Sequence, residues 1–528
     1  MLRPLLVLAC AGQLGAQPPP AADLDPARAF FAAGEVVRIS ITLNEADREH
    51  LRTKPREYVP AVLRVDRQPE WPRVAVKLKG AAGSFREIDD KPAFTVHLGK
   101  FGETNRLHGL QRFHLNNCVQ DDSCLCEWLG HEVFTAAGLP APRVAHALVT
   151  LDGRSLGLYV LREGYDRQFL MRVFGNAAGN LYDGGFCQDI DSDLEKDSGD
   201  GPDDHSDLRR LRELCEGIAN DRPARLEAAI DMPAFLDFMA LELMLGHWDG
   251  YTQTRNNYRL WCPTAPARVQ FLPHGMDQLF GEEDASVLDH PTSIVASACH
   301  QDAVLRKRYR ERLRALLPLF EPRRLLPKLE AIAGKLQKAL RSIDGDAATS
   351  HADAVRGLQE RVAARFRNLQ VQVKAPEPKP LQFSGNKPVA LKTWHPAAES
   401  DNVALARKDW KGINTLQIAC QKGPPEPRAA AWRTHALLER GHYRLAVTTR
   451  CEGVSKLADG ETDFGVRVAV VDGATSERLC GSQNWHPLVC EFEVSEFQKN
   501  IELELRLRAV SGTAWFRTDS LQLVRLSD

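Results

Sequence analysis

A proline-rich segment at residues 374–380 constrains the fold of this chain more than any other feature. It reads Lys-Ala-Pro-Glu-Pro-Lys-Pro, and alternating prolines and charges form a stiff, extended connector. The chain has 528 residues, which is more than the roughly 250–300 that one hydrophobic core supports. We therefore predict two domains, over residues 30–372 and 381–528, joined by a linker over residues 373–380.

The first predicted domain begins with strand patterns and continues with helical ones. Residues 36–41, 74–78 and 94–98 alternate apolar and polar side chains, which predicts strands, and residues 145–161 predict a hairpin around an Asp-Gly turn. A helix is expected over residues 123–137. Apolar residues recur at helical spacing over residues 208–218, 233–245 and 303–341, which predicts helices. A further hairpin is predicted between the last two, over residues 257–272. A small β lobe joined to a larger helical lobe is the outline of a protein kinase, so we predict an α+β, two-lobed, kinase-like fold.

The part after the linker has only short strand patterns separated by turns. Alternation recurs at residues 441–447, 464–470, 501–505 and 520–524. About 145 residues with this pattern and no helical stretch are typical of a β-sandwich. We expect an all-β, jelly-roll-like domain.

The N-terminal residues indicate export. Arg3 precedes the apolar residues 5–11, and Leu14-Gly15-Ala16 could form a small-residue cleavage site, so residues 1–16 are predicted to be a signal peptide. We expect a periplasmic, cell-surface or extracellular protein. No apolar run reaches the roughly 20 residues of a membrane-spanning helix, so no transmembrane segment is expected.

Charge and cysteine content exclude two classes of function. The chain has 68 basic and 70 acidic residues, a net charge of -2, whereas nucleic-acid binding needs a basic excess. Cys124 and Cys126 form a CxC pair that no second cysteine pair complements, so a zinc site is not expected. The 12 cysteines are compatible with disulfides in an oxidising compartment.

Three polar residues between positions 249 and 277 have the order needed for phosphoryl transfer. Asp249 follows a predicted helix, Asn256 and Asn257 come next, and Asp277 follows the predicted hairpin. Kinases use a carboxylate to accept the proton of the substrate hydroxyl, and an Asn and a second Asp to hold Mg²⁺. Asp249 is thus the candidate catalytic residue, Asp277 a candidate metal ligand, and Asn257 or its neighbour Asn256 the other.

Six short motifs in this region resemble the spore-coat CotH kinase family. They extend over roughly residues 35 to 290 and occur in the family's order: Lys79-Gly80 with Ser84, Lys91 before a strand, Gly157 to Glu163, Gly179-Asn180-Leu181-Tyr182, Gly246-His247-Trp248-Asp249 with Asn257-Tyr258, and residues 273–281 around Asp277. Two positions depart from the family's pattern, because Gly275 replaces an aspartate and Lys79 replaces an arginine.

The resemblance implies phosphorylation of protein hydroxyl groups with ATP and Mg²⁺ or Mn²⁺. Lys91 would contact the phosphates, with Lys79 and Ser84 in the nucleotide-binding loop, and Glu163 would lie at the adenine hinge. Asn257 and Asp277 would bind the metal. Glu132, in the predicted helix, is the expected ion-pair partner of the lysine. The expected substrates are surface or coat proteins. The alternative is a non-catalytic cell-envelope binding protein that retains the kinase-like fold.

The C-terminal part resembles the jelly-roll carbohydrate-binding modules of secreted enzymes. Residues 441–445 and 513–519 are similar to strands that recur in those modules. A polysaccharide is therefore a possible partner, and the candidate side chains for stacking on sugar rings are Trp394, Trp410, Trp432 and Trp485.

Overall fold

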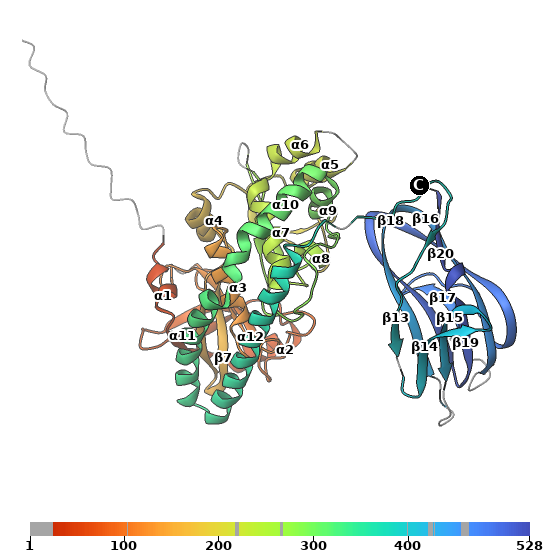
Figure 1. Ribbon diagram of the computed structural model, residues 1–528. Helices are drawn as coiled ribbons and strands as arrows, with labels where there is room; N and C mark the ends of the chain where they lie inside the picture. The colour runs from red at the N-terminus through yellow and green to blue at the C-terminus, as the bar shows by residue number, and fades with distance from the viewer. Residues whose placement is uncertain are drawn as a thin grey trace, which may run out of the picture. The chain divides into compact units, whose positions relative to one another are not determined.

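The computed structural model describes residues 25–102, 104–216, 221–264, 268–377, 379–398, 400–420, 426, 428–455 and 464–527 (Figure 1). The predicted signal peptide lies outside these residues. The chain divides into two compact units, one up to Val287 and from Pro291 to Lys374, the other from Leu288 to His290 and from Ala375 onward. None of the described helices is long and apolar enough to span a membrane.

A closed barrel opens the first unit. Its strands are hydrogen-bonded in the order β1-β2-β3-β4-β5-β7-β6, and a parallel pairing of β1 with β6 closes it. The strands are β1 (Val36–Thr42), β2 (Val59–Val65), β3 (Trp71–Lys79), β4 (Ala93–His97), β5 (Arg112–Asn116), β6 (Val144–Leu151) and β7 (Arg154–Glu163). Alternate residues of each strand point inward and form the barrel core, as in β1, where Val37, Ile39 and Ile41 are buried. The expected β lobe is thus a closed barrel, while its kinase-like pairing with a helical lobe remains a prediction.

A four-stranded sheet in the order β11-β10-β8-β9 lies in the remainder of the first unit. Its strands are β8 (Gly179–Asp183), β9 (Glu195–Gly199), β10 (Tyr258–Pro263) and β11 (Gln270–Pro273). The described helices of the first unit are α1 (Arg28–Ala33), α2 (Glu45–Thr53), α3 (Cys126–Ala136), α4 (Arg167–Phe174), α5 (Ser206–Cys215), α6 (Arg222–Ala229), α7 (Met232–Leu245), α8 (Tyr251–Thr254), α9 (Ile294–Gln301), α10 (Ala303–Leu316), the 3₁₀ turn η1 (Leu317–Phe320), α11 (Pro322–Arg341) and α12 (Gly345–Gln372).

Helix α7 is the central helix of this region. It begins where the Asp231 side chain accepts a hydrogen bond from Ala234 N–H, and it ends at Gly246, which has a left-handed φ of 67°. Nearly every residue between is buried, and a helix that is apolar all round belongs in a core. The turn that follows α7 therefore starts from a helix that is fixed in the core.

The second unit is all-β, as the sequence predicts. Strands β16 (Arg428–Ser455) and β18 (Gly481–Ala509) are long and pair antiparallel along their length, and register shifts interrupt this ladder near Gly441 and between Thr449 and Val454. The other strands are β12 (Val389–Ala390), β13 (His395–Ala398), β14 (Val403–Trp410), β15 (Ile413–Cys420), β17 (Gly465–Val470), β19 (Ser511–Arg517) and β20 (Gln522–Ser527), with the 3₁₀ turn η2 (Thr518–Ser520).

Candidate functional site

The turn that carries Asp249 is fixed by a buried carboxylate on α7. Glu242 accepts hydrogen bonds from Tyr251 N–H (3.0 Å), Thr252 N–H (2.8 Å) and the Thr252 hydroxyl (2.5 Å). Burial raises the pKa of Glu242 to about 7. A Cβ at Gly250 would lie 2.6 Å from Glu242 Oε1, so only glycine fits at that position. These contacts hold the segment between α7 and α8 in one conformation.

Asp249 is half-buried and is held by both candidate asparagines. Asn256 Nδ2 donates to Oδ1 (3.0 Å) and Asn257 Nδ2 donates to Oδ2 (2.6 Å), so each carboxylate oxygen has an amide partner. His247 is neutral in this environment, because burial lowers its pKa to about 4. Its Nε2–H donates to the carbonyl oxygen of His274 at 3.0 Å, which ties this turn to the segment that leads to Asp277.

Gly275 and Asn257 are packed against one another. Gly275 has a φ of 55°, and a Cβ on it would lie 2.3 Å from Asn257 Oδ1. The glycine that replaces the family's aspartate therefore leaves space for the Asn257 amide. Any side chain at position 275 would push that amide away from Asp249.

Lys79 at the end of β3 is half-buried, and its ammonium is close enough to Asp277 for the two charges to interact. Burial lowers the pKa of Lys79 to about 8, the positive charge of Arg162 acts in the same direction, and the charges of Glu127 and Asp277 oppose it. Lys79 Nζ donates to Asn116 Oδ1, and Asn116 Nδ2 in turn donates to Glu127 Oε2. Burial raises the pKa of Asp277 to about 7, and the negative charge of Glu127 raises it further. Strand β3, strand β5, helix α3 and the segment after β11 thus bring these groups together.

Lys91 and Ser84 lie in the loop that follows β3. The Lys91 ammonium lies 5.4 Å from the centroid of the Tyr159 ring. Asn117 Nδ2 donates to the carbonyl oxygens of both Ser84 (3.0 Å) and Lys91 (2.8 Å), and Ser84 Oγ accepts from Ala81 N–H (3.1 Å). The loop is therefore a compact turn held by the residue that follows strand β5, and its role in binding nucleotide stays a prediction.

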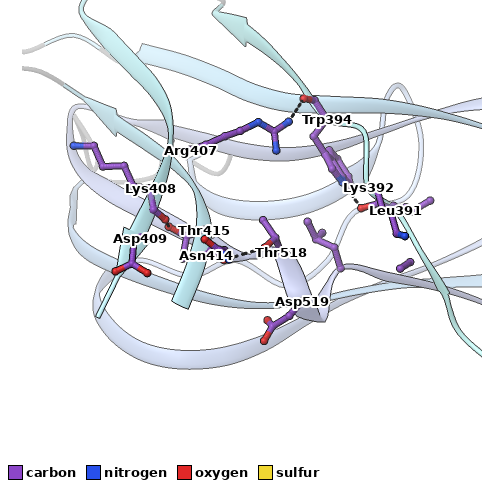
Figure 2. Close-up of a pocket in the computed structure, with 12 residues that line it drawn as sticks. Leu391, Lys392, Trp394, Arg407, Lys408, Asp409, Asn414, Thr415, Thr518 and Asp519 are labelled. Carbon is purple, nitrogen blue, oxygen red and sulfur yellow. Dashed lines mark hydrogen bonds between the residues drawn. The ribbon is translucent and has the colours of Figure 1, made fainter. Parts of the chain in front are cut away.

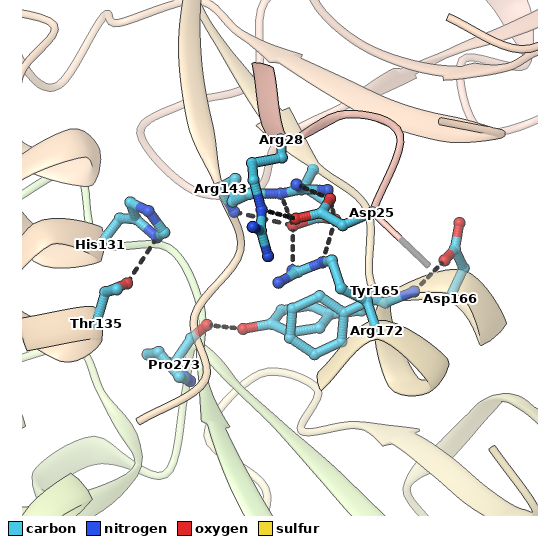
Figure 3. Close-up of polar contacts among 11 residues, drawn as sticks. Asp25, Arg28, His131, Thr135, Arg143, Tyr165, Asp166, Arg172 and Pro273 are labelled. Atoms are coloured by element: carbon cyan, nitrogen blue, oxygen red, sulfur yellow. Dashed lines mark hydrogen bonds and ion pairs between the residues drawn. The ribbon is translucent and has the colours of Figure 1, made fainter. Parts of the chain in front are cut away.

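Glu163 ends strand β7 between two arginines, Arg143 and Arg172. Figure 3 shows these arginines close to Asp25. Arg143 Nη2 donates to Oε1 at 2.7 Å, and Arg172 Nη2 donates to Oε2 at 2.6 Å. The Nε groups of both arginines and the Arg143 backbone N–H add three more hydrogen bonds. Arg143 also pairs with Asp25. Because five N–H groups already occupy its carboxylate, a nucleotide contact by the Glu163 side chain would have to displace one of them.

The helix predicted to carry the lysine's partner contains two glutamates, and the structure separates their roles. Glu132 pairs with Lys328 on α11 at 2.7 Å, so its expected pairing with the lysine is corrected. Glu127 is buried and joins Lys79 through Asn116. The sequence shows both glutamates on one helix but gives no sign of which one is buried.

Arg162 is a site residue that sequence reasoning missed. It is 1% exposed, lies 3.9 Å from Glu127 Oε1, and donates to His274 Nε2 at 2.9 Å. It lies in the last six residues of β7, which are all buried, and an arginine is rarely buried completely. That rarity is the signal that could have identified it.

In the second unit, the four candidate tryptophans have two different environments. Trp394 and Trp432 are each 3% exposed and belong to the core, so they cannot stack on a sugar. Trp410 and Trp485 are half-buried at the surface. A pocket of about 570 Å³ lies near the end of β14 and the start of β15, with Lys408, Asp409, Asn414, Thr415, Thr518 and Asp519 among its lining residues (Figure 2).

Comparisons with known proteins agree with the resemblance in the first unit. Residues 76–369 match the family model described as CotH kinase protein. Inner spore coat protein H of Bacillus subtilis (strain 168) is 21% identical over 249 residues, a match that covers 43% of this chain and 63% of that protein, and so less than two thirds of its length.

Three solved structures to which this chain is similar contain carbohydrate-binding modules. TmCBM61 in complex with β-1,4-galactotriose is 13% identical, with a TM-score of 0.19, and the match covers 26% of this chain and 90% of that one. The CBM22-1–GH10 modules of a Clostridium thermocellum xylanase with xylohexaose are 13% identical, with a TM-score of 0.19 and coverages of 27% and 29%. A variant of a family 29 module is 10% identical, with a TM-score of 0.17 and coverages of 26% and 90%. The family model covers more than half of the chain, and on that ground the protein belongs to the CotH kinase protein family.

Proposed function

We propose that this protein transfers the γ-phosphate of ATP to hydroxyl side chains of proteins, with Mg²⁺ or Mn²⁺ as cofactor. The observation that supports this most directly is the hydrogen-bonded chain from Lys79 through Asn116 to the buried Glu127. The half-buried Asp277, from a separate segment, is close enough for its charge to act on Lys79. A cation, its orienting glutamate and a carboxylate for the metal are the parts that kinase chemistry needs.

Lys79 would neutralise the phosphate oxygens of the nucleotide. Its ammonium is held by Asn116, which Glu127 orients in turn. Asp249 would accept the proton of the substrate hydroxyl. The amide donors of Asn256 and Asn257 fix its carboxylate, which favours one orientation toward an acceptor.

The residues around Asp277 fit a divalent cation. Its carboxylate lies in a region where burial and the charge of Glu127 both disfavour ionisation, and a bound cation would offset both effects. Asp277 and Asn257 would hold the metal. Mg²⁺ prefers such oxygen ligands and neutralises charge on the transferred phosphoryl group.

We further propose that the protein is exported and acts on surface or coat proteins, with the second unit binding a polysaccharide. The first residues support export, and a related protein is named as an inner spore coat protein. Family membership supports the kinase assignment.

Autophosphorylation of the purified chain with ATP and Mg²⁺ or Mn²⁺ tests the proposal. Label should appear, and it should be lost in Asp277→Ala and in Asp249→Asn. Lys79→Met should abolish labelling while Lys91→Met, a change to a lysine of the neighbouring loop, should retain most of it. Loss of label in Lys91→Met alone would reverse the assignment of the two lysines. Absence of label in the unmodified chain with both metals would refute the kinase function.

The packing of Gly275 against Asn257 favours one alternative, a non-catalytic binding protein. The Asn257 amide N–H donates to Asp249, and Gly275 contributes no acidic group. On this alternative, the chain would show neither label nor a nucleotide-induced thermal shift with either metal.

A further inference from the structure

Three half-buried tryptophans share one face of a sheet in the second unit. Gln417 of β15 pairs with Trp515 of β19, which pairs with Arg450 of β16, so these side chains lie side by side. The neighbouring residues Leu416 and Phe516 are buried on the opposite face, in the core. The first face therefore points away from the core.

Trp410 and Trp485 complete this surface, which we call the tryptophan face (Trp410, Trp485, Trp515, Lys411 and Arg450). Trp410 and Trp485 pack edge to face, with ring centroids 5.3 Å apart and planes at 83°. The guanidinium of Arg450 lies 5.0 Å from the centroid of Trp410 and 5.9 Å from that of Trp515. The face is a continuous aromatic surface with a cation in its middle.

The charges on this face are only partly balanced. The ammonium of Lys411 also lies 5.0 Å from the Trp410 centroid, so two cations share one indole ring. Arg450 donates to the neutral Asn484 (3.2 Å) and to the exposed Glu452 (3.3 Å). Two donors, Arg450 Nε and Trp485 Nε1, find no acceptor among the described residues. No carboxylate in the described part of the chain pairs with Lys411.

This combination fits a polymer of acidic sugars. Indole rings bind the apolar C–H faces of pyranose rings, and guanidinium groups bind carboxylates with charge-assisted hydrogen bonds. A neutral glycan would offer no carboxylate to Lys411, which has none among the described residues, and none to Arg450 beyond the exposed Glu452. Single-stranded nucleic acid also combines rings with negative charge, but it requires a continuous basic groove along its backbone. Beside Lys411 and Arg450, this face has Arg517, 6.0 Å from the Trp485 centroid, and the two arginines already pair with Glu452 and Asp519.

We propose that the tryptophan face binds a polysaccharide that carries carboxylate groups, such as a uronic acid polymer. This inference specifies the polysaccharide of the proposed function and does not depend on catalysis by the first unit. Asp277→Ala should bind the polymer as the unmodified chain does, so failure of the kinase proposal and failure of this one are distinguishable.

Binding of the full chain to polygalacturonate, alginate and glucuronate-containing xylan tests the proposal. Each polymer is compared with its methyl ester, which keeps the sugar rings and removes the charge. At least one acidic polymer should bind, and its ester should bind about tenfold more weakly. Arg450→Gln and Lys411→Gln should weaken binding of the acid several-fold and leave binding of the ester unchanged, whereas Trp515→Ala should weaken both.

Arg444→Gln is the matched control, because Arg444 lies on the same strand β16 and pairs with Glu491 outside the tryptophan face. It should not change binding. Equal binding of acid and ester would refute the role of charge, and no binding of any of the three polymers would refute the site. Tighter binding of single-stranded DNA than of every uronate polymer would also overturn the proposal.

Discussion

Arg365 on α12 provides the sharpest test of how the first unit holds its candidate catalytic segments. It is completely buried, and it donates to four carbonyl oxygens: Leu243 (2.7 Å), Met244 (3.1 Å), Glu283 (3.1 Å) and Ala285 (2.6 Å). The first two belong to the last turn of α7, where carbonyls have no helical partner and the helix dipole favours a cation. The other two follow Asp277 in the chain. Burial lowers the pKa of Arg365 to about 10, so it remains charged at neutral pH.

The cost of Arg365→Met follows from the surroundings of the four carbonyls. Glu283 is exposed and Ala285 is half-buried, so water can replace the arginine there, whereas Leu243 and Met244 are buried. Each hydrogen bond from a charged donor to a buried carbonyl contributes about 1.5–3 kcal/mol. Loss of two such bonds should lower the free energy of unfolding by about 3–6 kcal/mol. Arg365→Lys, which has one nitrogen, should lose about half of this.

Urea unfolding of the full chain, followed by far-ultraviolet circular dichroism at the helical band, measures this change. The described α-helices all lie in the first unit, so this signal reports on it. Arg367→Met is the control, because Arg367 is exposed on the same helix and its loss should change the free energy by less than about 0.5 kcal/mol. A loss below about 1 kcal/mol for Arg365→Met would show that water satisfies the end of α7, and the reasoning would be wrong.

Three further predictions use the same unfolding measurement. Glu163→Gln should destabilise the first unit by about 3–5 kcal/mol, because the buried Glu163 is the carboxylate that two half-buried guanidinium groups share, and of these only Arg143 has a second one, Asp25, among the described residues. The same change at the partly exposed Glu132 should cost less than about 1 kcal/mol. Gly275→Ala should cost about 1–3 kcal/mol through its left-handed φ and its clash, and Gly281→Ala, where a Cβ meets no atom within 4 Å, should be neutral. Asp277 binds its proton more tightly in the folded state (pKa about 7) than in the unfolded state, so its contribution to stability should fall as pH rises from about 4 to about 7. Asp277→Asn should remove that decrease, and a pH profile identical to that of the unmodified chain would contradict the assignment.

Local sequence patterns predict most of the individual elements. The helix expected at residues 233–245 is α7 (Met232–Leu245), and the strands expected at 36–41 and 94–98 are β1 and β4. The single helical stretch expected over 303–341 is instead α10 and α11, separated by the 3₁₀ turn η1 that contains Pro318. Proline lacks the N–H that would continue the helix, so the sequence held the signal for this break as well.

The sequence by itself determined the two-part organisation of the chain, the family motifs and the order of Asp249, Asn257 and Asp277. Only the tertiary structure decided that β1 and β6 close a barrel, that Trp394 and Trp432 are core residues, and that Glu127 is joined to Lys79 through Asn116 whereas Glu132 pairs with Lys328. Periodicity reports which face of an element is apolar, and that is a local property. Which charged side chains share a low-dielectric region depends on segments far apart in the sequence, whose packing no local pattern encodes.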